Sequence, residues 1–338
     1  MANLSVRPLQ PADLDPIAAL LAARHARDSA NLPAMDPALL DPGACASVLA
    51  AALGDQRSNG AVAVRDGAII GFLLGERMLL PPDHVFARYI APHSISMGIT
   101  SHAVAAGEDA VTVYRELYAA LAEGWAGEGF FVHTANIPAG DADVQEAWVA
   151  LGFGRTTTAA VRDTSAVPAS MPAGVEVHQA GPEDIGAIVA LSGALERHHA
   201  GGPIFWPVLH DADRAVHAAH VHTLADPGNA HFVAYREGTA LGMQTFWKPG
   251  FTPSTVSPRE SIYLYEGVVD SEVRSGGVGS ALLAHSLDWC REQGYDWCCL
   301  HYASANPSGA PFWQRQGFVA VEYIMQRHID ERIAWANR

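Results

Sequence analysis

Residues 265–283 read YEGVVDSEVRSGGVGSALL, a mostly apolar strand pattern that leads into a glycine-rich turn and then into helical spacing. Such a turn presents several backbone N–H groups in one direction, and the dipole of the helix that follows adds partial positive charge. Because glycine has no Cβ, an anion can approach the main chain closely. The segment is therefore predicted to cradle a diphosphate, with the charge of Arg274 at the start of the loop.

Two common phosphate-binding loops are excluded. A Walker P-loop needs a Gly-Lys pair, and Lys248 is the only lysine in the chain. A Rossmann fingerprint needs a third glycine, whereas GVG at 277–279 is followed by SAL, and the segment comes late in the chain. Residues 274–279 do satisfy the pattern (Arg/Gln)-x-x-Gly-x-(Gly/Ala).

This pattern resembles the coenzyme A loop of the GNAT N-acetyltransferase superfamily. The resemblance covers most of residues 175–327, because Asn306 and a Gly-Phe pair at 317–318 follow at the family's spacing. It implies an α/β fold on a mixed sheet, with acetyl-CoA as acyl-donor cosubstrate and direct acetyl transfer to a small amine. It also implies that a strand N–H near Val268 or Val269 holds the thioester carbonyl. The coenzyme-binding residues that it implies are Val268, Val269, Arg274, Ser275, Gly276, Gly277, Val278, Gly279, Ser280, Asn306 and Trp313.

The general acid departs from the family pattern. The usual tyrosine is replaced by Trp313, whose indole N–H is not a useful acid. Tyr302, Tyr263 and Tyr265 are substitutes that the sequence does not rank, and Tyr302 is taken as the candidate. The vacant position also supports an alternative, a non-catalytic acyl-CoA-binding sensor or a pseudoenzyme.

The general base is open as well. Glu266 lies in the strand that leads to the loop, and a carboxylate in a nearly apolar strand is expected to have a raised pKa that suits a base. The alternative is that Glu266 pairs with an arginine or faces solvent.

The two sides of residues 163–174, a proline-bearing segment without hydrophobic periodicity, repeat one another. The last residue of RDG at 65–67 and of REG at 236–238 differ by 171, and further landmarks recur at nearly the same offset: Val6 with Val177, Pro11 with Pro182, Asp13 with Asp184, Trp148 with Trp313 and Phe153 with Phe318. We therefore predict two tandem GNAT-like domains, 1–162 and 175–338, joined by a linker at 163–174. The layout is similar to that of mycothiol synthase.

The first repeat has lost the loop. At the offset of 165, Asp109 takes the place of the loop arginine, and Thr112 and Tyr114 take the places of two loop glycines. Glu108 and Asp109 would repel a diphosphate, and Tyr114 would fill its space. The donor site is therefore predicted in the second half only.

Composition limits the partners. The chain has 338 residues, 49% of them hydrophobic, and a net charge of −15, which supports a sizeable core and excludes wholesale disorder. Because an acidic chain repels phosphate backbones, we expect no nucleic-acid partner, and a cationic or neutral small substrate fits its field better. No apolar run approaches the roughly 20 residues that span a bilayer, and no signal-peptide pattern is visible. We expect a cytoplasmic monomer or homodimer with no membrane partner.

Three further features carry weaker expectations. The four cysteines lack CxxC spacing and are expected to be reduced, mostly buried thiols. His217, His220 and His222 lack a nearby cysteine or carboxylate pair to complete a tetrahedral set, so we predict no metal. Residues 201–207 combine glycines with aromatics and read equally as a lid or as a packed loop.

Overall fold

The computed structural model describes residues 4–32, 35, 37–81, 84–208, 212–248, 258 and 260–336. The strands of the first half are β1 (Ser5–Pro8), β2 (Ser58–Arg65), β3 (Ala68–Leu79), β4 (His93–Met97), β5 (His102–Val104), β6 (Val132–Pro138) and β7 (Gly154–Asp163). Its helices are α1 (Leu14–Asn31), α2 (Pro42–Gly54), α3 (Ala110–Gly127) and α4 (Ala142–Ala150), with a 3-10 turn η3 (Val85–Arg88) before β4.

The second half repeats this order. Its strands are β8 (Val175–Gln179), β9 (Ala230–Arg236), β10 (Thr239–Trp247), β11 (Ser261–Val269), β12 (Trp297–Ala303) and β13 (Val319–His328). Its helices are α5 (Ile185–Ala200), α6 (Ala212–Ala225), α7 (Val278–Glu292), α8 (Gly309–Arg315) and the short C-terminal α9 (Ile333–Ala336).

Both halves contain the hairpin turn that the repeated triplet predicts. Asp66 and Gly67 join β2 to β3 with φ angles of 51° and 80°. Glu237 and Gly238 join β9 to β10 with φ angles of 48° and 75°. Two consecutive left-handed residues are the requirement of a type I′ turn, which is why a glycine ends both triplets. The duplication read from the sequence is thus visible in the backbone.

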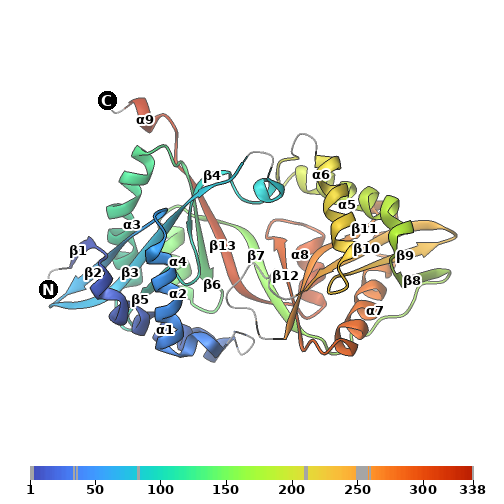
Figure 1. Cartoon of the computed structure of the whole chain (residues 1–338), viewed down its shortest axis with the longest axis horizontal. Coiled ribbons are helices and arrows are strands. Elements are labelled where there is room, and N and C mark those ends of the chain that lie inside the picture. Colours follow the sequence, from blue (N-terminus) through green and yellow to red (C-terminus); the bar gives the residue numbers. More distant parts are fainter. Residues whose placement is uncertain are drawn as a thin grey trace.

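The strands of the described residues form one sheet in the order β1-β2-β3-β4-β6-β13-β7-β12-β11-β10-β9-β8, with β5 paired to β3. The last strands of the two halves are exchanged, because β13 pairs with β6 and β7, while β7 pairs with β12. Figure 1 shows β13, coloured red, among the strands of the first half. Each half therefore completes the sheet of the other, and the boundaries 1–162, 163–174 and 175–338 stay a prediction.

Helices cover both faces of each half of the sheet. In the first half, α1 and α2 pack on one face through Ile17 and Leu49, and α3 and α4 pack on the other through Leu117 and Trp148. In the second half, α5 packs on one face and α7 and α8 on the other. This is the mixed α/β arrangement that the sequence predicts.

The cysteines lie in the packed core. All four cysteines are free and buried, and the adjacent Cys298 and Cys299 belong to different core clusters. None of the helices among the described residues combines the length and apolar character that a membrane span requires. In that same part of the chain, no group of three or more His, Cys, Asp or Glu side chains is placed to hold a metal ion.

Candidate active site

The strands β11 and β12 part near the middle of the sheet. Residues Ser261–Leu264 of β11 pair in parallel with residues Trp297–Leu300 of β12. Among the described residues, the pairing of these two strands goes no further. A β-bulge places Tyr265 as an extra residue of β11 at the same point. Bulges end strand pairing and re-aim side chains beside active sites. The result is an unpaired gap between residues 266–269 and residues 301–303.

The glycine-rich loop follows β11 and opens α7. Ser275 and Gly277 have φ angles of 67° and 85°, so the loop turns through two left-handed residues. Gly277 is the N-cap of α7 and has no side chain with which to cap it. The amides of Val278, Gly279 and Ser280 in the first turn of the helix are therefore available to an external acceptor.

Arg274 lies at the start of this loop. Its side chain is exposed, and its Nε donates a hydrogen bond to the backbone oxygen of Val269 at 3.2 Å. This contact holds the guanidinium group beside the end of β11, where an anion bound to the amides of α7 would lie within its field.

Two glycines keep the gap open. A Cβ at Gly267 would lie 2.9 Å from the ring of Trp313, and a Cβ at Gly279 would lie 3.3 Å from the ring of Phe312. The first distance is shorter than real Cβ contacts, and the second is tighter than most. A side chain at either position would therefore displace an aromatic ring of α8 or occupy the gap itself.

The loop and the gap open into a cavity of about 1430 Å³. Of the predicted coenzyme-binding residues, Gly276 alone is outside the lining, and the two predicted catalytic residues, Glu266 and Tyr302, both line it. The opposite wall comes from the first half, through residues 86–92 and strands β4, β6 and β7, and from the exchanged strand β13.

Asn306 has a structural task at the edge of the cavity. Its Oδ1 accepts hydrogen bonds from the backbone amides of Ser308 at 3.1 Å and Gly309 at 2.9 Å. The side chain thus holds the start of α8, the helix that carries Trp313. Trp313 itself is only 8% exposed and packs on Phe318, so the indole at the family's acid position is part of the core.

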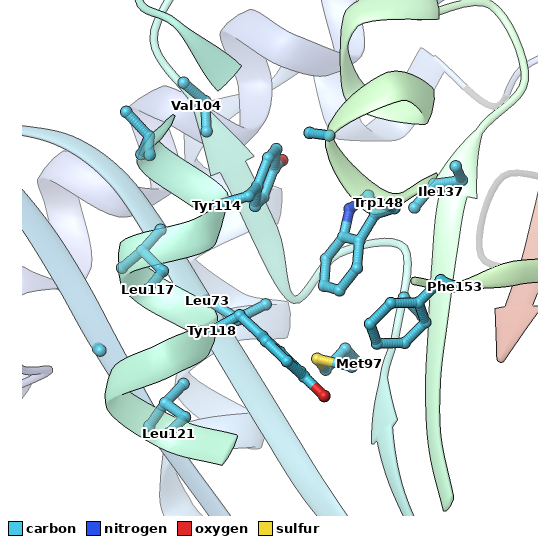
Figure 2. Close-up of a cluster of buried hydrophobic side chains, with 14 of the residues drawn as sticks. Leu73, Met97, Val104, Tyr114, Leu117, Tyr118, Leu121, Ile137, Trp148 and Phe153 are labelled. Carbon is cyan, nitrogen blue, oxygen red and sulfur yellow. The ribbon is translucent and has the colours of Figure 1, made fainter. Parts of the chain in front are cut away.

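In the first half, the equivalent gap is filled. At the offset of 165, His102 and Tyr114 take the positions of Gly267 and Gly279. Both side chains are fully buried, and their rings lie 5.6 Å and 5.4 Å from the ring of Trp148, the counterpart of the second-half tryptophan. Figure 2 shows Tyr114 and Trp148 within this core.

The start of α3 carries its own anion. Asp109 is the N-cap residue of α3, and its Oδ2 accepts a hydrogen bond from the hydroxyl of Thr112 at 2.6 Å. This hydrogen bond, together with backbone amides of the first turn, lowers the pKa of Asp109. A carboxylate therefore stands in the first half where α7 presents only amides and glycines.

Glu266 is buried and paired, which corrects the expectation of a raised pKa. Its Oε1 accepts a hydrogen bond from Ser192 at 3.1 Å and lies 3.7 Å from Nη2 of Arg88, and its Oε2 lies 3.5 Å from Nε2 of His220. Burial favours the neutral acid, but the approach of His220, the charge of Arg88 and the hydrogen bond from Ser192 outweigh it, so the pKa of Glu266 is lowered. The alternative reading, pairing with an arginine, describes the side chain better.

Arg88 is a site residue that the sequence does not reveal. It belongs to η3 of the first half, is 8% exposed, and pairs with Glu196 of α5 while donating to the hydroxyl of Tyr265. Because it reaches Glu266 across the two halves, it ties the first repeat to the bulged strand β11. No sequence motif surrounds Arg88. Its contact with Glu266 depends on the way the two halves share one sheet.

The three tyrosines differ in their surroundings. Tyr265 stacks on Trp247 with ring centroids 3.6 Å apart, and burial raises its pKa to about 12. Burial also raises the pKa of Tyr263. Tyr302 lies on β12 beside the gap, 7% exposed and in contact with the cavity. Tyr302 is thus the tyrosine that adjoins the gap.

His301 is a second residue that the sequence reading missed. It follows Leu300, the last residue of β12 that pairs with β11, and its ring lines the cavity. Burial lowers its pKa to about 4, and its Nδ1 has no hydrogen-bond partner in the described part of the chain. A neutral imidazole therefore borders the gap. In the sequence, its position next to Tyr302 was the one feature that pointed to His301.

The segment 201–207 combines both expected roles. Trp206 packs edge-on against Tyr89 of the first half, with ring centroids 5.3 Å apart, whereas Phe205 is 74% exposed. Both line the cavity. One aromatic is therefore anchored across the two halves and the other is open to solvent.

The comparisons with known proteins agree with this geometry. Residues 197–318 match the model of the acetyltransferase (GNAT) family. The second half carries a GNAT domain. No curated protein matches the chain in sequence. The GNAT match contains the bulged strand, the glycine-rich loop, Asn306 and Trp313.

Solved structures extend the GNAT fold to the whole chain. A GCN5-related N-acetyltransferase from Sphaerobacter thermophilus is 16% identical, with a TM-score of 0.58, and the match covers 96% of this chain and 95% of that one. A tandem GNAT protein from the clavulanic acid biosynthesis pathway, described without AcCoA, is 16% identical with a TM-score of 0.50, covering 96% and 98% of the two chains. At these identities the similarity shows the fold, so the predicted tandem GNAT fold is confirmed.

A third structure matches the same length of this chain. It is described as a GCN5-related glucosamine N-acetyltransferase region in a fungal multi-domain GH3 beta-N-acetylglucosaminidase, and it is 14% identical with a TM-score of 0.54. The match covers 96% of this chain and 38% of that chain.

Proposed function

We propose that the protein is an acetyl-CoA-dependent N-acetyltransferase that acts on a small amine by direct transfer, with its donor site in the second half only. One observation carries this proposal. The gap beside Gly267 and Gly279 is open, whereas His102 and Tyr114 fill the equivalent gap of the first half. A duplicated fold that keeps one gap open and closes the other is expected when only one copy binds the donor.

The residues present fit the donor. Three amides at the start of α7, two left-handed loop residues and the charge of Arg274 suit a diphosphate, and the glycines leave room that a Cβ would fill. Acetyl-CoA, when bound, supplies an activated thioester acyl group. In this proposal, the backbone N–H of Val268 or Val269 donates to the acyl oxygen as charge develops there.

The proton-transfer roles follow from the surroundings of the candidates. An amine must be neutral to attack, so its proton needs an acceptor at the gap. Nδ1 of His301 has no hydrogen-bond partner among the described residues, whereas the carboxylate of Glu266 is paired with Arg88. His301 therefore takes the role of base in this proposal, and Glu266 the role of an anionic anchor for Arg88. Tyr302, beside the gap, is the group proposed to protonate the departing thiolate.

A second candidate is a non-catalytic acyl-CoA-binding module. The observation that favours it is that the buried Trp313 occupies the position where the family keeps a tyrosine. An indole N–H cannot serve as the acid there. Release of free thiol from acetyl-CoA in the presence of amines separates the two, since a binding module releases none.

A thermal-shift experiment tests the donor site. Acetyl-CoA at millimolar concentration is expected to raise the melting temperature of the wild type, and Gly279→Tyr is expected to abolish the shift by copying the first half. The matched control is Gly124→Tyr on the exposed face of α3, where a Cβ would meet nothing within 4 Å. An unchanged melting temperature in the wild type would refute the proposal.

A further inference from the structure

The stretch of β11 that borders the gap has a partner strand on one side. Residues 266–269 pair with β10, and within the described residues the pairing of β11 with β12 stops at Leu264. The amides proposed to hold the thioester carbonyl, those of Val268 and Val269, belong to this stretch. A strand with one partner is constrained by fewer hydrogen bonds than a strand inside the sheet, so the contacts of its side chains have more influence on where its amides lie.

The bulge directs two successive side chains of β11 to one group of the first half. In a regular strand, neighbouring side chains point to opposite faces of the sheet. Tyr265 is the extra residue of the bulge, and its hydroxyl accepts a hydrogen bond from Nη2 of Arg88. The same Nη2 lies 3.7 Å from Oε1 of Glu266, the next residue. Arg88 therefore holds the bulge from outside the second half.

The guanidinium of Arg88 is itself fixed in place. Its Nη1 pairs with Glu196 of α5, and its charge also faces Glu266. The guanidinium carbon lies 4.8 Å from the centre of the ring of Tyr89, its neighbour in the chain. A planar guanidinium presents its N–H donors in a rigid fork, so two carboxylates that bind it also set the direction of the donor that reaches Tyr265.

Glu266 is held by the second half as well. Ser192 of α5 donates to its Oε1 at 3.1 Å, and Nε2 of His220 on α6 lies 3.5 Å from its Oε2. Glu266, His220 and Arg88 are all buried. Hydrogen bonds between buried polar groups are stronger than those in water, so this cluster is a rigid support for the bulge.

The ring of Tyr265 connects the support to the gap. The ring stacks on Trp247 of β10, with ring centroids 3.6 Å apart, while the hydroxyl binds Arg88. The second half thus fixes the plane of the ring, and the first half fixes its hydroxyl end. Val268 follows Tyr265 by three residues along the same extended chain, so a displacement of the bulge is passed on to the amides at the gap.

We propose that Arg88 is a positioning residue for acyl transfer, which sets the place of the β11 amides through the hydroxyl of Tyr265. This proposal rests on the proposed function and gives the first half a part in it. The repeat that closes its own gap supplies a side chain that shapes the open one. Among the described residues, the partners of Arg88 lie on α5 and β11 and not in the loop 274–280, so donor binding is expected to be independent of them.

Thiol release by the full chain tests this proposal, with acetyl-CoA and the amine that the wild type acetylates fastest in a panel of small amines. Tyr265→Phe removes the hydroxyl that Arg88 binds and is expected to lower kcat about tenfold, with KM for acetyl-CoA and the melting shift unchanged. Arg88→Met is expected to lower kcat about 10²-fold, and Arg88→Lys, which keeps the charge but not the fork, to lie between Arg88→Met and the wild type.

A double variant shows whether the two residues act together. Arg88→Met/Tyr265→Phe is expected to be no slower than Arg88→Met, because both changes break the same contact. Since Arg88→Met also destabilises the fold, Tyr265→Phe and Arg88→Lys decide the test on their own if it does not fold.

The matched control is Tyr235→Phe, which removes another hydroxyl of the second half, one that donates to Oδ1 of Asp184 at 2.8 Å. This control is expected to keep the kcat of the wild type. A wild-type kcat in either Tyr265→Phe or Arg88→Lys, or a double variant in which the two losses multiply, overturns the positioning role while the proposed function stands. A wild type that releases thiol with none of the amines overturns the proposed function, and the positioning role with it.

Discussion

The hydroxyl oxygen of Tyr114 lies 2.8 Å from Nδ1 of His102, and both residues are replaced by glycine at the equivalent positions of the second half. The other ring nitrogen of His102, Nε2, lies 2.9 Å from the backbone oxygen of Asn136 on β6. In the first repeat, the side chain of His102 therefore occupies the space between the strands and is in hydrogen-bond contact with a backbone oxygen there. The second repeat leaves the corresponding space to a ligand, which is the relationship behind the proposed function.

Tyr114→Phe tests this relationship from the closed side. The substitution removes a hydroxyl from a fully buried pair and leaves Nδ1 of His102 unsatisfied, so we expect a loss of about 1–3 kcal/mol in the free energy of unfolding. The melting shift with acetyl-CoA should persist, since the donor site is proposed in the other half. Urea denaturation measures the change in stability, and thermal shift measures the response to acetyl-CoA. A variant that no longer responds to acetyl-CoA would contradict a donor site in the second half only.

Arg88→Met is expected to weaken the contact between the halves. Arg88 is buried with Glu196 and Glu266, and its removal leaves two carboxylates without their common partner. Breaking a buried ion pair in this way costs about 3–5 kcal/mol of unfolding free energy.

The control for this variant is Arg57→Met. The side chain of Arg57 is 53% exposed and pairs with Asp55 and Glu76 at the surface, so its loss should destabilise the fold much less than the loss of Arg88. Equal destabilisation by the two variants in urea denaturation would contradict the buried role of Arg88.

Stability should fall as the pH drops from 7 to 5. Burial lowers the pKa of His102 to about 3 and those of His133 and His231 to about 4, while an unfolded histidine titrates near 6.5. Below that pH the unfolded chain binds more protons than the folded one, so stability is complete above about 6.5 and declines toward about 4. At pH 5 each such histidine costs about 2 kcal/mol.

One buried acid acts in the opposite direction. Burial raises the pKa of Asp28 to about 6, so its protonation favours the folded state as the pH falls, but several histidines outweigh a single carboxyl. Urea denaturation at pH 7, 6 and 5 measures the slope, and His102→Gln should make it shallower. A stability that stays constant over this range would contradict the prediction.

The second half was largely readable from local patterns. Apolar strand runs, the glycine at each hairpin turn and the helical spacing after Gly277 are local signals. The apolar run at 261–269 predicts a strand, and β11 lies over those residues. Helical spacing predicts a helix over 183–197, and the structure has a 3-10 turn over Pro182–Asp184 followed by α5, which continues to Ala200. The acidic residues mark the start, but no strong stop signal ends the helix before Gly201.

Long-range relationships were not readable. The exchange of β7 and β13 depends on which sheet edge each last strand meets, and nothing in the local pattern of either strand encodes that choice. Arg88 and Glu266 are 178 residues apart and meet only through this arrangement. The sequence therefore leaves two readings of Glu266 open, a base with a raised pKa or a partner of an arginine, and the structure supports the second, with a lowered pKa.

The assignment of the base can be tested by pairing His301→Asn with Glu266→Gln. His301 borders the gap as a neutral imidazole, and loss of a general base lowers kcat by about 10²–10⁴-fold. We expect a decrease of that size for His301→Asn at pH 7, with an unchanged melting shift by acetyl-CoA, when thiol release is measured with the amine that the wild type acetylates fastest in a panel of small amines. Glu266→Gln should mainly lower stability, because it removes a partner of Arg88. The exposed His217→Asn on α6 is the control, and full activity of His301→Asn beside an inactive Glu266→Gln would return the role of base to the carboxylate.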